Sequence, residues 1–215
     1  MTPHAGDRSN GYEEFADHFM ASRNRRIGVS AVLDWSSTLP ARGAVLDVGC
    51  GNGLPISQAL IEAGFSVFGI DASATMIAAF RQQFPTAQAE HSSVQDSTLF
   101  NRTFDGIVAW GLIFLLPLDV QPGVIRKLAG ALNDGGKLLF TAPAETVTWR
   151  DVLTDRECFS LGAKKYYELL RDLGLTIDAG CTDEGDNYYL SGIKDSPADV
   201  IFARQPSIAA DRLPD

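Results

Sequence analysis

The chain has 215 residues and a formal net charge of −9, from 18 Lys and Arg residues against 27 Asp and Glu residues. This charge disfavours nucleic acid as a partner, because phosphate groups are repelled. No apolar run approaches the roughly 18 residues of a membrane span. The three widely spaced cysteines indicate neither a disulfide framework nor a metal site. We expect one globular unit in the cytoplasm, since the polar start of the chain does not resemble a signal peptide.

The first 36 residues predict a helical cap. Within residues 12–36, Tyr12, Phe15, Ala16 and Phe19 recur at spacings that place them on one face of a helix. An apolar face of this kind packs either against the edge of a sheet or over a bound ligand. The sequence of this segment leaves both possibilities open.

Residues 44–53 predict a buried strand followed by a glycine-rich turn. Residues 44–48 are apolar enough for a parallel strand that is covered on both faces. Gly49, Gly51 and Gly53 then allow a sharp turn and a close approach of backbone to ligand. Pro55 suits the start of a helix, whose free N–H groups would face whatever the loop holds.

A second strand is predicted at residues 65–70, and Asp71 follows it directly. A carboxylate at this end of the second strand of a βαβ unit can bind the two hydroxyls of a ribose. The alternative is that Asp71 caps the helix that begins near residue 74, with Ser73 as the competing cap.

The glycine spacing separates two classes of nucleotide-like cofactor. Dinucleotide-binding loops have the pattern GxGxxG, but Leu54 stands where the third glycine belongs. The chain instead has AspxGlyxGlyxGly from Asp47 to Gly53, which resembles motif I of the class I S-adenosylmethionine-dependent methyltransferases. In that family the acidic residue after the second strand matches Asp71. The resemblance implies an α/β, three-layer Rossmann-like methyltransferase fold, with a mainly parallel seven-stranded sheet and a C-terminal antiparallel hairpin.

The resemblance extends along the chain and implies further contacts with the cofactor. After a third strand at residues 87–91, the adenine site would use a backbone N–H of Val94 and a polar group from Ser93 or Asp96. A fourth strand within residues 104–111 would bring Trp110 and Gly111 beside the sulfonium. The cofactor-binding residues expected in all are Tyr12, Asp47, Gly49, Cys50, Gly51, Asp71, Ala72, Met76, Ser93, Val94, Trp110 and Gly111.

The segment after the predicted fifth strand is expected to enclose the acceptor. It contains a polar, irregular stretch at residues 149–156 and an amphipathic helix capped by Ser160. Trp149, Arg150 and Tyr166 are the candidates for the acceptor wall, with ordinary packing as the alternative for the two aromatic residues. Two interpretations stay open for Arg23, Arg25 and Arg26. Either one of them binds the methionine carboxylate, or they form a solvated basic stretch.

The sequence therefore predicts a cap at residues 1–36, an S-adenosylmethionine-binding methyltransferase domain at 37–195 and a C-terminal tail at 196–215, forming one structural domain overall. The expected reaction transfers a methyl group to a small molecule and releases S-adenosylhomocysteine, mainly by positioning and desolvation. The alternatives are a protein methyltransferase and a non-catalytic S-adenosylmethionine-binding module. The sequence indicates neither the oligomeric state nor a catalytic residue, because nothing selects among His91, Glu145 and Tyr166 as a general base.

Overall fold

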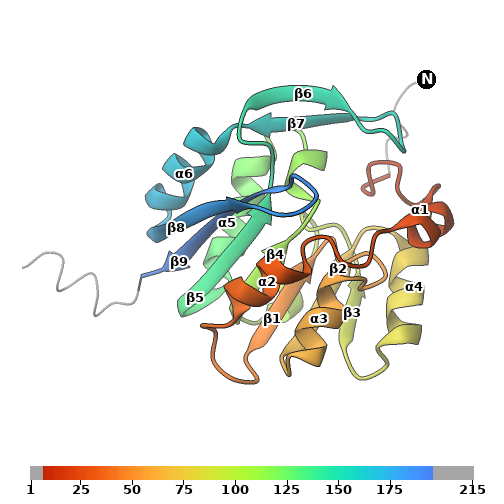
Figure 1. Ribbon diagram of the computed structural model, residues 1–215, viewed down its shortest axis with the longest axis horizontal. Coiled ribbons are helices and arrows are strands. Elements are labelled where there is room, and N and C mark those ends of the chain that lie inside the picture. The colour runs from red at the N-terminus through yellow and green to blue at the C-terminus, as the bar shows by residue number, and fades with distance from the viewer. Residues whose placement is uncertain (1–6, 196–215) are drawn as a thin grey trace, which may run out of the picture.

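The computed structural model describes residues 7–195, which form a seven-stranded sheet covered by helices (Figure 1). The strand order is β3-β2-β1-β4-β5-β9-β8, in which the first five strands are parallel and β9 is antiparallel to both of its neighbours. The predicted mainly parallel sheet with a C-terminal hairpin is confirmed. The strands are β1 (Ala44–Val48), β2 (Ser66–Asp71), β3 (Gln88–His91), β4 (Phe104–Ala109), β5 (Leu132–Thr141), β8 (Leu175–Thr182) and β9 (Tyr188–Lys194).

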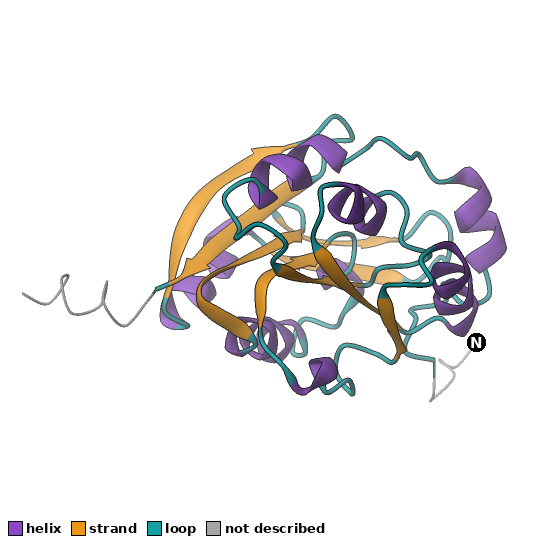
Figure 2. Ribbon diagram, turned by 90° about the horizontal axis from the view of Figure 1, so that it is seen from below, coloured by secondary structure: helices purple, strands orange, loops and turns teal. Residues whose placement is uncertain are grey.

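Helices cover both faces of this sheet and complete three layers (Figure 2). Side chains alternate along β1, so Val45 packs with one set of helices while Leu46 and Val48 pack with the other. The first face is covered by α2 (Val29–Ser36), α3 (Ile56–Glu62) and α4 (Ala74–Gln83), and the second by α5 (Gln121–Gly130) and α6 (Ala163–Asp172). All five residues of β1 are buried, as expected for a central parallel strand.

The N-terminal segment differs from the prediction of one helix over residues 12–36. It forms α1 (Ala16–Ser22) and α2, and Tyr12 precedes both helices in a turn. The backbone leaves the helical region at Arg23, where ψ is 127°. Gly28 begins α2 with φ +84°, and a Cβ there would lie 2.9 Å from the ring of Trp110. The break is therefore set by close packing at Gly28, which the apolar periodicity does not reveal.

Residues 146–161 contain a β-hairpin that sequence analysis did not predict. β6 (Thr146–Arg150) and β7 (Glu157–Leu161) form a separate two-stranded sheet beside the main one (Figure 1). Ser160 lies in β7 and does not cap α6, because Gly162 is the residue before that helix. The hydroxyl of Ser160 donates instead to the carbonyl of Pro143 at 2.7 Å, which ties the hairpin to the end of β5.

Further expectations from the sequence concern membrane spans, metal sites and the division of the chain into segments. Across residues 7–195 no helix is both long and apolar enough to cross a bilayer. In the same range, no three His, Cys, Asp or Glu side chains are grouped so that they could hold a metal ion. The predicted tail at 196–215 lies outside the described residues, and the division into cap, domain and tail stays a prediction.

Candidate functional site

The loop after β1 turns across the end of β2. The N–H groups of Gly49 and Cys50 both donate to the carbonyl of Ile70, at 2.8 and 3.1 Å. Gly49 and Gly51 have φ values of +73° and +55°, a region that glycine adopts without strain. A Cβ on Gly51 would meet only the sulfur of Met76, at 3.9 Å. The loop therefore presents bare backbone to open space at Gly51.

The third glycine of the loop, Gly53, is needed for close packing and not for an approach to open space. A Cβ on Gly53 would lie 2.5 Å from the ring of Phe84 and 2.9 Å from that of Phe80, both from the α4 region. Gly53 therefore allows the loop to pack closely on α4. The glycine loop therefore exposes its backbone at Gly51 and packs against α4 at Gly53.

Asp71 lies at the end of β2 and is joined to the glycine loop. Its two carboxylate oxygens accept hydrogen bonds from the N–H groups of Gly51 and Ser73, each at 2.8 Å. Ser73 is the cap of α4, since its hydroxyl accepts from the N–H of Met76 at 3.1 Å. Burial raises the pKa of Asp71, while these two N–H groups oppose the rise. Each oxygen keeps a lone pair for a further donor, which is what a ribose diol supplies.

Asp47, at the end of β1, is only 2 % exposed. Its carboxylate accepts a hydrogen bond of 2.6 Å from the hydroxyl of Ser57. Burial and the negative charge of Asp71 together raise the pKa of Asp47 to about 7, against the hydrogen bond from Ser57 and the positive charge of Arg23. The cavity wall therefore contains a carboxyl group that takes up a proton near neutral pH.

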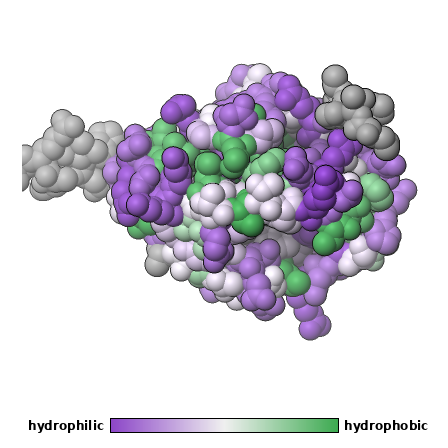
Figure 3. Space-filling view, turned by 90° about the horizontal axis from the view of Figure 1, so that it is seen from above, coloured by the Kyte–Doolittle hydropathy of each residue, from purple (hydrophilic) through white to green (hydrophobic). Residues whose placement is uncertain are grey.

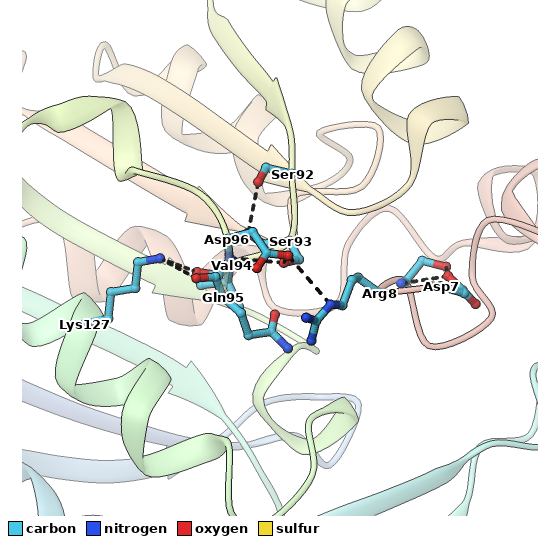
Figure 4. A network of polar contacts seen from close by, with 9 residues as sticks. Asp7, Arg8, Ser92, Ser93, Val94, Gln95, Asp96 and Lys127 are labelled. Atoms are coloured by element: carbon cyan, nitrogen blue, oxygen red, sulfur yellow. Dashed lines mark hydrogen bonds and ion pairs between the residues drawn. The ribbon is translucent and has the colours of Figure 1, made fainter. Parts of the chain in front are cut away.

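The loop after β3 forms a network of polar contacts (Figure 4). The hydroxyl of Ser93 donates to Asp96 at 2.7 Å and accepts from the N–H of Asp96 at 3.2 Å. Arg8 reaches Asp96 from the N-terminal segment, with 3.6 Å between Nε and Oδ2. Ser93 lines the cavity described below, whereas Asp96 does not. Of the two groups considered for adenine, the structure places only Ser93 at the cavity.

One cavity of about 650 Å³ joins these elements. It lies where the carboxyl ends of β1, β2 and β4 meet at one edge of the sheet. Ligands of open α/β sheets bind at this edge. The twelve residues predicted to bind the cofactor all line it, namely Tyr12, Asp47, Gly49, Cys50, Gly51, Asp71, Ala72, Met76, Ser93, Val94, Trp110 and Gly111.

An N-terminal strap, residues 7–13, crosses the cavity and joins elements on both sides. Glu13 accepts hydrogen bonds from the hydroxyls of Ser73 and Thr75 at the start of α4. Tyr12 donates to Asp151, at the turn after β6, over 3.0 Å. Asp7 lies 3.6 Å from the Nη2 atom of Arg156 on the same turn. The strap and the β6–β7 turn therefore form a cover that is closed by side-chain contacts.

Arg23 follows α1 and is the cation of the N-terminal segment that lies deepest in the cavity wall. Its guanidinium lies 4.1 Å from the centre of the Trp110 ring and 4.6 Å from that of Phe19. Its buried Nε has no hydrogen-bond partner among the described residues. Burial lowers the pKa of Arg23 to about 10. Arg25 and Arg26 are exposed.

The three residues predicted for the acceptor wall do not line the cavity. Tyr166 is fully buried, and its hydroxyl donates to Gln121 at 2.6 Å, because the apolar face of α6 packs on the sheet. Trp149 packs against the cavity-lining Phe114, with 5.4 Å between ring centres and the rings tilted by 45°. Arg150 is exposed and donates to the carbonyl of Asp155 at 2.8 Å. The hairpin contributes its turn to the cavity, whereas Trp149 and Arg150 lie on β6 and Tyr166 lies on α6.

The side of the cavity under the cover contains residues that the sequence analysis did not assign to it. They come from the segment after β4, from the β6–β7 turn and from the β8–β9 turn, and they include Phe114, Leu116, Asp151, Val152, Leu153 and Asn187. Phe19, which lies on the apolar face predicted for the N-terminal segment, lines the cavity as well. His18 and Asp151 are wall residues that can accept a proton. The three bases considered from sequence, His91, Glu145 and Tyr166, lie outside the wall.

Comparison with known proteins agrees with this geometry. Residues 12–179 match the family described as "Methyltransferase domain". A Bacillus subtilis (strain 168) protein named "Putative methyltransferase YqeM" is 36% identical over 75 residues, which are 34% of this chain. The match spans only 30% of the length of that relative.

Solved structures share the fold at low identity. A Burkholderia thailandensis 1,6-didemethyltoxoflavin-N1-methyltransferase, solved with 1,6-didemethyltoxoflavin and S-adenosylhomocysteine, has a TM-score of 0.69 at 18% identity, covering 91% of this chain and 93% of its own. A magnesium protoporphyrin IX methyltransferase from Synechocystis PCC 6803, solved with S-adenosylmethionine, has a TM-score of 0.58 at 16% identity, covering 88% and 82%. Taken with the match over residues 12–179, the glycine loop and the sheet order show that this chain belongs to the methyltransferase domain family.

Proposed function

We propose that the protein transfers a methyl group from S-adenosylmethionine to a small, largely apolar molecule. The observation that carries this proposal is that one continuous cavity runs from the glycine loop and Asp71 to the aromatic residues of the cover. A cofactor at the sheet edge and an acceptor under the cover would then share one enclosed space. The two solved neighbours described above are methyltransferases named for small molecules, which agrees with this choice.

The cofactor fits the wall in three parts. Asp71 accepts the ribose hydroxyls, and the bare backbone at Gly51 allows the ligand to approach. The Ser93 hydroxyl, which keeps one free lone pair, accepts from the adenine amine. Arg23 binds the methionine carboxylate, since its buried Nε lacks a partner and its charge is partly desolvated. A charge-assisted hydrogen bond satisfies both conditions.

The acceptor occupies the side of the cavity that is covered by Phe19, Trp110 and Phe114. Apolar walls exclude water and hold a planar or aliphatic molecule in line with the sulfonium. Methyl transfer needs little more than this, because the methyl group on sulfur is already electrophilic. Where the acceptor must lose a proton, His18 and Asp151 are the candidate bases on the side of the wall under the cover.

The two alternatives make different demands on the surface and the cavity. A protein methyltransferase needs an open groove for a polypeptide, whereas here the strap and the β6–β7 turn meet across the cavity. On the face shown in Figure 3, hydrophobic patches are small and interrupted by hydrophilic residues, so no broad apolar groove is visible there. A module that only binds S-adenosylmethionine does not require the aromatic chamber beyond Trp110.

A fractionated extract separates these possibilities. The protein is incubated with S-adenosylmethionine and either the ultrafiltrate or the retained macromolecules of a cell extract, and release of S-adenosylhomocysteine is measured. We expect turnover only with the ultrafiltrate. Turnover with the retained fraction alone would favour a protein substrate. Tight binding of S-adenosylmethionine on calorimetry without turnover in any fraction would favour the non-catalytic module.

A further inference from the structure

Lys127, on α5, uses its ammonium group to hold the loop after β3. Its Nζ donates to the carbonyl oxygens of Val94 at 2.8 Å and Gln95 at 2.9 Å, and also to that of Ser97 (Figure 4). These three bonds use all three donors of the ammonium. The side chain is half-buried, and its charge is satisfied by backbone oxygens alone. A surface lysine that merely confers solubility does not converge on one loop in this way.

Because these carbonyl oxygens point at Lys127, the N–H groups of the same peptide units point away from it. In a trans peptide the carbonyl and the following N–H point in opposite directions. The Val94 carbonyl points at Lys127, so the N–H of Gln95 points away from α5. Val94 and Gln95 line the cavity, whereas Lys127 does not. Their N–H groups have no hydrogen-bond partner within residues 7–195.

The loop closes a single turn in which the Ser93 carbonyl accepts from the N–H groups of Asp96 and Ser97, at 3.1 and 2.9 Å. The first two N–H groups of such a turn are left over, as they are at the start of a helix. A positive charge on the carbonyl side polarises these peptides and stabilises this orientation. The free N–H groups beside Ser93 are therefore suited to a ligand atom that accepts hydrogen bonds, and a ring nitrogen is such an atom.

We propose that Lys127 is a positioning residue for the adenine ring. It does not touch the cofactor; through the carbonyl oxygens of Val94 and Gln95 it holds the turn so that the N–H of Gln95, or that of Val94 before it, donates to a ring nitrogen while Ser93 meets the exocyclic amine. Lys127 thereby contributes to the recognition of the N1 or N3 atom of adenine. This inference rests on the proposed placement of the cofactor.

The test compares S-adenosylhomocysteine with its 1-deaza and 3-deaza analogues, each of which lacks one ring nitrogen, by titration calorimetry. Wild type should bind one analogue about five- to tenfold more weakly, the effect of one hydrogen bond. In Lys127→Met that preference should fall below about twofold, since the N–H is no longer held. Arg126→Met, an exposed neighbour on α5, is the matched control and should retain the preference.

The outcomes are distinct. If Lys127→Met binds all three ligands more weakly but keeps the wild-type preference, Lys127 serves stability alone and the inference is overturned. If wild type binds none of them, the cofactor placement itself fails. A second measurement needs no variant: the amide proton of Val94 or Gln95 should shift downfield on binding S-adenosylhomocysteine and not on binding the discriminating analogue. Equal shifts with both ligands would also overturn the inference.

Discussion

The two sides of the cavity are built in different ways. On the cofactor side, the decisive bonds join turns that directly follow neighbouring parallel strands, such as Asp71 to Gly51, and most of them involve backbone groups. On the cover side, the bonds join side chains far apart in the chain, such as Tyr12 and Asp151, 139 positions apart. Backbone bonds next to a sheet share its stability, whereas isolated surface contacts open easily. The cofactor side should therefore be preformed and the cover should move.

The largest effect should come from blocking the preformed side. Gly51→Val places a side chain in the open space beside the loop, so affinity for S-adenosylhomocysteine should fall by more than about a hundredfold. Gly64→Val is the matched control: Gly64 has φ +93° and no atom within 4 Å of a Cβ, but does not line the cavity. Both variants should lose stability through backbone strain, and only the first should lose the ligand in calorimetry. Equal affinity in the two variants would refute the assignment of the loop.

Removing the carboxylate of Asp71 should have the next largest effect. Asp71→Ala should weaken S-adenosylhomocysteine about ten- to a hundredfold, because charged hydrogen bonds to the ribose are lost. It should also lower stability, since two N–H groups lose their acceptor. An analogue without the ribose hydroxyls provides the control: wild type should bind it more weakly than the parent compound, and the variant should bind both alike. A preference that persists in the variant would exclude Asp71 from ribose binding.

A smaller effect is expected at the cover. Tyr12→Phe deletes the bond to Asp151, so S-adenosylhomocysteine should dissociate about two- to tenfold faster in stopped-flow measurements. Tyr188→Phe, which removes a comparable bond to Tyr167 outside the cavity wall, should leave the rate unchanged. Hydrogen exchange of wild type should show ligand-dependent protection at residues 11–26 and 149–156. Identical exchange with and without ligand would mean that the cover does not close on it.

The smallest effect concerns Asp47 and appears only as a function of pH. Its pKa in the folded state, about 7, lies above that of an ordinary aspartate, so the folded protein binds the proton more tightly than the unfolded chain. Stability is therefore lost as pH rises from about 4 to 7. Asp47→Asn keeps an acceptor for Ser57 and should raise the melting temperature by about 2–4 °C at pH 8. The gain should shrink at pH 5; a gain independent of pH would point to another cause.

The cofactor side could be predicted from the sequence because its signals are local. The glycines and Asp71 follow apolar strands, and the carboxyl ends of parallel strands meet at one edge. The twelve residues that these signals and the family resemblance together assigned all line the cavity, although their contacts with a cofactor stay a prediction. Arg8 and Lys127 were not found, since their partners are backbone or side-chain atoms of a loop distant in the chain.

The cover could not be predicted to the same extent. Residues 146–150 do alternate polar and apolar side chains, but this run is only five residues long and residues 157–161 show no regular apolar alternation, so the hairpin was not recognised. Without the hairpin, the wall was assigned to Trp149 and Arg150, whereas the turn at Asp151, Val152 and Leu153 reaches the cavity. Tyr166 was assigned because it lies in the segment after the fifth strand, whereas its full burial and its hydrogen bond to Gln121 show that it belongs to the core.

The separate pairing of β6 with β7 has a consequence for how such proteins diversify. Among the described strands, these two pair with each other and with no strand of the main sheet. Insertions or deletions in the turn between them leave every register of the seven-stranded sheet unchanged. Evolution or a protein engineer can therefore reshape this side of the cavity through residues 151–156 while the glycine loop and Asp71 are inherited intact.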